Sequence, residues 1–230
     1  MFQVIHEYDE STNQVLEQLK GTNSVIIKDG SGSMGFNFDT PMVVETVKNG
    51  LFGSKTSTSN LSREQAANEL ALAYVQQVMI SDPAPDLCIF DDTFWYEQDC
   101  VLGSSSFSRF LSQRSSGEDY IIPALDHAFK VHNARKANPL EKSKTIAYIF
   151  LDGACADRNL LPNWIRNTAS RLTSQDEFHI IFTKIGRVNL DSFYSSLDNL
   201  DDVKYDIVSF FSLDQIFTSG LDTHLKTILA

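Results

Sequence analysis

Short runs of apolar, largely β-branched residues alternate along the chain with stretches in which apolar residues recur every three or four positions. A continuous apolar run bounded by turn residues is typical of a buried strand, and the wider spacing is typical of a helix that covers a sheet. The alternation therefore predicts an α/β fold with a Rossmann-like, open and mostly parallel six-stranded sheet. We expect helices on both faces and one antiparallel edge strand.

The same pattern assigns most of the chain to elements within one domain over residues 1–230. The expected strands are 24–29, a hairpin over 85–99 with its turn at Asp91 and Asp92, 144–153, 178–186 and 205–211. The expected helices are 9–21, 61–81, 106–113, 119–136, 159–174, 190–200 and 212–229. Residues 1–21 are expected to form an N-terminal helical extension. Residues 30–60 are rich in Gly, Ser and Thr, which predicts a long loop with one helical turn around Val43–Val47.

Two polar residues precede predicted helices and are expected to cap them. Ser62 stands before the apolar-periodic stretch of the 61–81 helix, and Asp157 stands before the helix that begins at residue 159. Ser and Asp side chains accept hydrogen bonds from the free N–H groups of a first helical turn.

Charge and cysteine content exclude several classes of protein. Among 230 residues, 30 acids oppose 19 bases, a formal net charge of −11. Such a chain lacks the clustered bases that nucleic acid or an anionic membrane surface requires. The first residues are too polar for a signal peptide, and no apolar run approaches the roughly 20 residues that span a bilayer. Three widely spaced cysteines without a CxxC motif fit a reducing compartment, so we expect a cytoplasmic protein.

Two predicted central strands end on an acid that is followed by glycine. Asp29 ends the strand in "IIKDG", and Asp152 ends the strand in "FLDG". In an open parallel sheet, ligands bind at the carboxyl ends of the strands, so both acids are expected to face one crevice. Ser31 and Ser33 follow Asp29 at every second position, and the glycines between them allow a tight curl. Oxygen ligands of this kind suit a hard divalent cation such as Mg²⁺.

These motifs resemble the metal-ion-dependent adhesion site of von Willebrand factor A domains, which opens with Asp-x-Ser-x-Ser after the first strand. The resemblance covers nearly the whole chain from about residue 22. Within that family, the chain most resembles the bacterial tellurite-resistance-associated A domains. The segment "FYSSLDNLDDVKYDIVSFF" is similar to the last strand of those domains and the helix that precedes it. The resemblance implies that Ser31 and Ser33 bind Mg²⁺, Mn²⁺ or Ca²⁺ directly, and that Asp29 and Asp152 hold the ion directly or through waters. In that family, an acidic side chain of a partner protein fills the open coordination position.

The third metal loop departs from the family pattern, because the usual threonine is absent from "SSGEDYIIPAL". Counting back from Ala124–Leu125 puts Asp119 in its place, and a slip of one residue would put Glu118 there. An added carboxylate makes the site more negative, which favours a bare cation and repels a partner's carboxylate. Alternatively, the loop swings away and the other four residues hold the metal, or the site binds no metal.

The resemblance implies a non-enzymatic, metal-dependent protein interaction module in a stress or defence pathway. The loops at 34–60, 101–118 and 153–159 would form the rim that selects the partner. Two other functions remain open: metal-assisted hydrolysis of a phosphate or amide, and a structural or assembly role for a site that has lost its metal. Considered alone, Asp29 and the serines could also simply stabilise a turn.

Overall fold

The computed structural model describes residues 21–36, 43–50, 53–60, 62–78, 82–112, 117–185, 190–212 and 215. The helix predicted at 9–21 lies outside these residues except for Gly21. Of the helix predicted at 212–229, only residues 212 and 215 are described.

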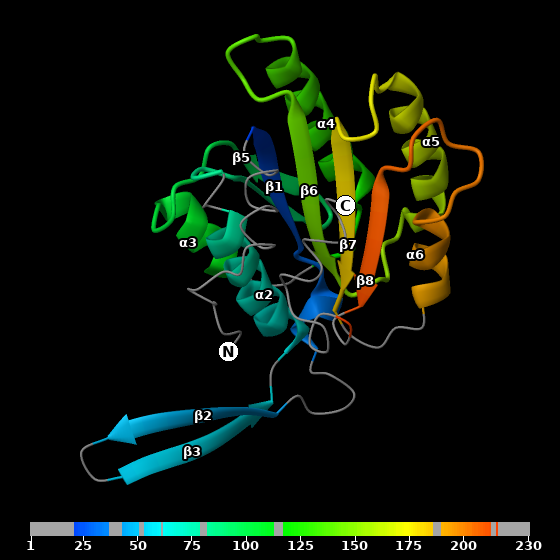
Figure 1. Ribbon diagram of the computed structural model, residues 1–230. Coiled ribbons are helices and arrows are strands. Elements are labelled where there is room, and N and C mark those ends of the chain that lie inside the picture. The colour runs from blue at the N-terminus through cyan, green and yellow to red at the C-terminus, as the bar shows by residue number, and fades with distance from the viewer. Residues whose placement is uncertain are drawn as a thin grey trace.

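A six-stranded sheet in the order β5-β4-β1-β6-β7-β8 forms the centre of the fold (Figure 1). Its strands are β1 (Thr22–Asp29), β4 (Asp86–Phe90), β5 (Phe94–Glu97), β6 (Lys144–Leu151), β7 (Phe178–Lys184) and β8 (Val208–Ser212). Neighbouring strands are parallel except at the edge, where β4 and β5 form an antiparallel hairpin. The structure thus confirms the predicted α/β fold, including its antiparallel edge strand.

Helices bury both faces of this sheet. They are α2 (Arg63–Val78), α3 (Ser105–Ser112), α4 (Ile122–Lys136), α5 (Leu161–Arg171) and α6 (Asp191–Leu197), with short 3₁₀ segments η1 (Gly32–Gly35) and η2 (Arg158–Leu160). Ile26 packs in one core with residues of α2 and α3, whereas its neighbours Val25 and Ile27 pack in the other with α4, α5 and α6. Successive residues of a strand point to opposite faces, so a strand covered on both sides must be apolar throughout.

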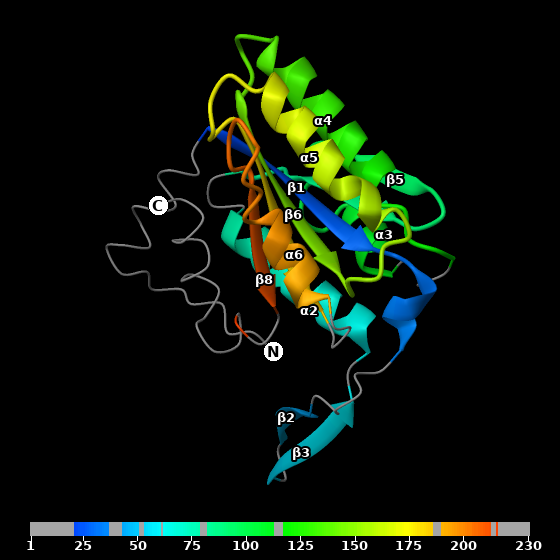
Figure 2. The same cartoon turned by 90° about the vertical axis from the view of Figure 1, so that its right-hand side faces the viewer.

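Residues 43–60 correct one prediction. Instead of a loop with a helical turn, β2 (Val43–Gly50) and β3 (Gly53–Asn60) form an antiparallel hairpin, with Gly50 paired to Gly53. The i,i+4 spacing of Val43 and Val47 also satisfies the two-residue period of a strand, and the many Val and Thr residues favour extended backbone. The hairpin projects away from the sheet and its helices (Figures 1 and 2).

Ser62 caps α2 as predicted. The backbone N–H of Gln65 donates to Ser62 Oγ over 3.1 Å, and the Gln65 side chain accepts the backbone N–H of Ser62 over 2.8 Å. These reciprocal bonds satisfy two N–H groups that the first turn would otherwise leave free. The cap fixes where α2 begins, immediately before Arg63.

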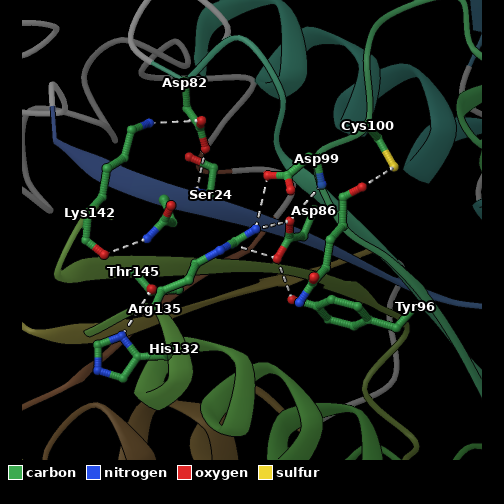
Figure 3. A network of polar contacts seen from close by, with 12 residues as sticks. Ser24, Asp82, Asp86, Tyr96, Asp99, Cys100, His132, Arg135, Lys142 and Thr145 are labelled. Carbon is green, nitrogen blue, oxygen red and sulfur yellow. Dashed lines mark hydrogen bonds and ion pairs between the residues drawn. The ribbon is translucent and has the colours of Figure 1, made fainter. Parts of the chain in front are cut away.

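A buried ion pair lies at the end of the sheet where the parallel strands begin (Figure 3). Arg135 of α4 donates two hydrogen bonds of 2.8 Å to the carboxylate of Asp86, the first residue of β4. That carboxylate also accepts the Tyr96 hydroxyl at 2.7 Å and the backbone N–H of Asp99 at 3.0 Å. Asp86 has no exposed surface, so four donors replace the water that its charge has lost.

Two further polar contacts lie at the same end of the sheet (Figure 3). Asp82 accepts the backbone N–H of Ser24 at 2.7 Å and the ammonium group of Lys142 at 2.9 Å. His132 Nδ1 lies 3.0 Å from the Thr145 hydroxyl. These contacts tie the starts of β1 and β6 to the chain around them, at the end opposite Asp29 and Asp152.

None of the helices in the described part of the chain combines the length and apolar character needed to cross a lipid bilayer. Cys88, Cys100 and Cys155 are all buried free thiols.

Candidate functional site

The chain changes direction across the sheet between β1 and β6. From β1, the chain builds β4 and β5 on one side, and it then returns to place β6 on the other side of β1. A crevice opens at such a switch point, at the carboxyl ends of the strands. Asp29 is the last residue of β1 and Asp152 directly follows β6, so the topology places both predicted acids at this point.

Three carboxylates converge there. One oxygen each of Asp29, Asp119 and Asp152 lies within 4.8 Å of the others. Asp29 and Asp152 have no exposed surface, and Asp119 is 7% exposed. Three buried acids at this separation repel one another strongly, and in the described structure only one cation, that of Arg63, forms an ion pair with any of them.

The segment after β1 holds the two predicted serines beside Asp29. The backbone N–H of Ser31 donates to Asp29 Oδ1 over 2.8 Å, and the hydroxyls of Ser31 and Ser33 lie 3.0 Å apart. Gly30 lets the segment pass close to β4, because a Cβ there would lie 2.7 Å from Ile89 Cγ2. Close approach, more than a special backbone angle, explains this glycine.

The third loop presents Asp119 to the cluster and turns Glu118 elsewhere. Asp119 Oδ1 accepts the backbone N–H of Ala156 at 3.1 Å, which ties the loop to the segment after β6. Glu118 is exposed and accepts the Tyr120 hydroxyl at 2.9 Å. Of the two residues that the sequence left open for this position, the geometry therefore favours Asp119.

Asp157 caps a different helix from the one predicted. Its carboxylate accepts the backbone N–H groups of Ile121 at 3.1 Å and Ile122 at 2.8 Å, at the start of α4. It makes no side-chain cap on the 3₁₀ segment that follows it. The prediction was wrong because the free N–H groups nearest in space belong to a helix that begins 35 residues earlier in the sequence. The bond also braces the loop that carries Asp119.

Gly117 joins the third loop to the first, since its carbonyl accepts the backbone N–H of Gly32 at 3.1 Å. Its φ of +77° disfavours any side chain, and a Cβ would lie 2.3 Å from Asp92 Oδ2. Gly117→Ala is expected to lower the free energy of unfolding by more than the ~1 kcal/mol that a left-handed alanine costs. Urea denaturation measures this change.

Gly103→Ala is the matched control for that prediction. Gly103 has a φ of +83° but nothing within 4 Å of an added Cβ, so it should incur only the backbone cost. Equal losses in the two variants would show that the Asp92 side chain simply moves aside.

Burial governs the electrostatics of the cluster. Burial raises the pKa of Asp29 to about 7, against hydrogen bonds from Ser31 that lower it, and the charges of Asp152 and Asp119 raise it further. Burial likewise raises the pKa of Asp119 to about 6, with the charge of Asp152 adding to the effect. Both carboxyls therefore carry a proton part of the time near neutral pH, and a bound cation would have to displace it.

Arg63 belongs to the site and was missed by sequence reasoning. Its Nη1 lies 3.1 Å from Asp152 Oδ2, and the residue is only 8% exposed. The pair joins positions 89 apart in the sequence, so no local pattern identifies Asp152 as the partner. One signal was available: Arg63 is the first residue of α2, and a cation is unfavourable at a helix N-terminus unless an acid compensates it.

The side-chain atoms that could bind a metal in this cluster are all oxygens. Oxygens around Mg²⁺ at about 2.1 Å lie about 3 Å apart when adjacent and about 4.2 Å apart when opposite, and Ca²⁺ allows wider spacing. Three carboxylate oxygens within 4.8 Å fit such a cation after a small contraction. Thiolate and imidazole, which softer metals prefer, are not part of this set. The residues present thus fit Mg²⁺, Mn²⁺ or Ca²⁺.

The chain was also compared with known proteins. No family model matches its sequence, and no curated protein matches it either.

Proposed function

We propose that this chain is a cytoplasmic, non-enzymatic protein interaction module of the von Willebrand factor A type. Asp29, Asp119 and Asp152, with the hydroxyls of Ser31 and Ser33, would hold one Mg²⁺ or Mn²⁺. A bound divalent cation supplies an electrophilic centre for an acidic side chain of a partner protein. The observation that carries the proposal is the convergence of three buried carboxylates at the switch point of the sheet, from the end of β1, from the third loop and from the segment after β6.

The surroundings of the cluster support a protein partner. Each of the three acids is followed within eight residues by a large exposed apolar side chain: Phe36 is 66% exposed, Tyr120 39% and Leu160 57%. The loops are bonded to one another through Gly32 and Gly117, and through Asp119 and Ala156. Exposed aromatic and aliphatic groups around a buried polar centre are typical of the anchors of protein interfaces.

The β2–β3 hairpin adds a second surface at the same end of the molecule. It is inserted between η1, which carries Ser33, and α2, which begins with Arg63. In Figures 1 and 2 it extends away from the rest of the described structure. A two-stranded hairpin is only marginally stable alone, so a partner protein that packs against it would stabilise it. The hairpin therefore supports a role for residues 34–60 in partner choice.

Metal titration tests the proposal directly. Isothermal titration calorimetry of Mg²⁺ and Mn²⁺ into chelator-treated protein should show one ion bound per chain. Asp119→Asn should weaken binding at least about tenfold, because it removes one of three charges that attract the ion. Glu118→Gln is the matched control, because Glu118 is the neighbour of Asp119 in the sequence but its carboxylate accepts the hydroxyl of Tyr120. It should bind metal as the unchanged protein does.

Each of the other outcomes has a distinct meaning. Loss of affinity in Glu118→Gln but not in Asp119→Asn would assign the third loop to Glu118. No heat of binding up to millimolar metal would overturn the proposal. The cluster would then be a structural ion pair in which Arg63 is the permanent cation.

A further inference from the structure

The inference concerns Arg63 and rests on the proposed metal site. When its acids are ionised, the cluster carries three negative charges, and Arg63 neutralises one through Asp152. Two negative charges remain, which one divalent cation would neutralise. The cation and the guanidinium would nevertheless compete for the same carboxylate, since Asp152 Oδ2 accepts Nη1 of Arg63 at 3.1 Å.

The guanidinium is also incompletely paired. Arg63 Nε is buried and has no hydrogen-bond partner among the residues that the structure describes. A buried donor without an acceptor destabilises the folded state, and a buried charge without a counter-ion destabilises it more. Nε and Nη1 belong to the same rigid guanidinium, so the unpaired donor is part of the group that holds Asp152. An oxygen acceptor brought by a ligand would satisfy it.

The other carboxylate oxygen of Asp152 and its backbone N–H also form hydrogen bonds. Its other oxygen, Oδ1, accepts the backbone N–H of Ala154 at 3.0 Å, and its own N–H points to Asp29 Oδ2 at 3.4 Å. A metal that took the Oδ2 lone pair to which Nη1 now donates would displace Arg63 and leave its charge without a counter-ion in a largely buried position. A ligand carboxylate that bridges the metal and Arg63 would remove that penalty.

We propose that Arg63 makes the site a joint receptor for a divalent cation and a carboxylate. Without a carboxylate, Arg63 holds Asp152 and lowers the affinity for the cation. With one, the guanidinium pairs with the ligand and leaves Asp152 to the metal. Cation and carboxylate thus bind cooperatively, and each raises the affinity for the other by the same factor. This offsets the repulsion that Asp119 adds against an acidic partner.

Mg²⁺ titrations with and without a small carboxylate test this inference. The wild-type protein is titrated in sodium chloride and in sodium acetate of equal ionic strength, with acetate as the probe. Acetate should raise the apparent Mg²⁺ affinity severalfold. Arg63→Gln should bind Mg²⁺ about tenfold more tightly than wild type in chloride, because a competing positive charge is gone. Its affinity should no longer depend on acetate. Arg166→Gln, at the exposed pair with Asp202, should behave as wild type.

The outcomes separate this inference from the proposed function. If wild type binds Mg²⁺ equally in chloride and acetate, the cooperative receptor is wrong, while the metal site stands. That comparison needs no variant, so it decides the matter even where Arg63→Gln folds poorly. If wild type binds Mg²⁺ in neither salt, both proposals fail.

Discussion

Arg135→Met is expected to lower the free energy of unfolding by about 3–5 kcal/mol, because it strands a buried carboxylate. Asp86 has no exposed surface and receives two of its four hydrogen bonds from Arg135 (Figure 3). Burial already raises the pKa of Asp86, and Arg135 opposes that rise. Without the guanidinium, Asp86 must remain charged with only Tyr96 and a backbone N–H, or take up a proton. Urea denaturation at neutral pH measures the loss.

Arg166→Met is the matched control, because it breaks an ion pair of similar length at the surface. Arg166 lies 2.9 Å from Asp202, whose side chain is 67% exposed. Exposed pairs contribute less than about 1 kcal/mol, since water replaces the partner. The double variant Asp86→Asn with Arg135→Met should recover part of the loss, as it removes the stranded charge. Comparable losses for Arg135→Met and Arg166→Met would contradict a structural role for the buried pair.

The sheet could be predicted from sequence because its strands are buried on both faces. Runs such as Val25–Ile27 and Ile146–Leu151 must be apolar throughout, and that signal is local. The β2–β3 hairpin carries no such run, because its pairs join residues such as Glu45 with Thr58 and Lys48 with Lys55. Its extended state follows from cross-strand pairing, which a reading of single segments does not detect. Element type was therefore predictable where burial determines it.

In the candidate site, too, residues fixed by a local pattern could be predicted, and residues placed by packing could not. Asp29 and Asp152 could be predicted because both end buried strands, and topology then brings strand ends together. Arg63 and the capping role of Asp157 could not, because each pairs with a group set by packing in space. Asp152 lies 89 positions from Arg63, and Ile122 lies 35 positions from Asp157. Side-chain partners across loops depend on three-dimensional placement that no spacing encodes.

Asp29→Asn is expected to abolish metal binding and yet stabilise the metal-free protein. The amide keeps an oxygen for the backbone N–H of Ser31 but removes one of three converging charges. Because burial raises the pKa of Asp29 to about 7, ionising it in the folded state costs free energy above that pH. The shift from 3.8 to about 7 corresponds to about 4 kcal/mol at pH 8. The amide NH₂ would then face the backbone N–H of Asp152 in place of Asp29 Oδ2, so we expect a net gain of about 2 kcal/mol in the free energy of unfolding. Binding of Mg²⁺ should fall below detection by calorimetry.

The gain should depend on pH in a defined direction. Asp29 has a folded pKa of about 7 against a model value of 3.8, so its stabilising protonation is complete below 3.8 and is lost as the pH rises through 7. His179 opposes this trend, because burial lowers its pKa to about 4 and acidification below 6.5 costs stability. The informative quantity is therefore the difference between Asp29→Asn and wild type, measured by urea denaturation in chelator from pH 5 to pH 8.

That difference should grow in favour of the variant up to about pH 7 and then level off. Saturating Mg²⁺ should reverse it, since free metal at 100 times Kd stabilises only the protein that binds it, by about 2.7 kcal/mol. A variant that is less stable than wild type at every pH would instead mean that the Asp29 carboxylate is a structural group. The serines beside it would then stabilise a turn, and Arg63 and backbone N–H groups would hold the three acids together. A carboxylate that lowers the stability of the metal-free protein but is needed to bind metal is typical of a functional site, where stability is lower because the residues suit a ligand.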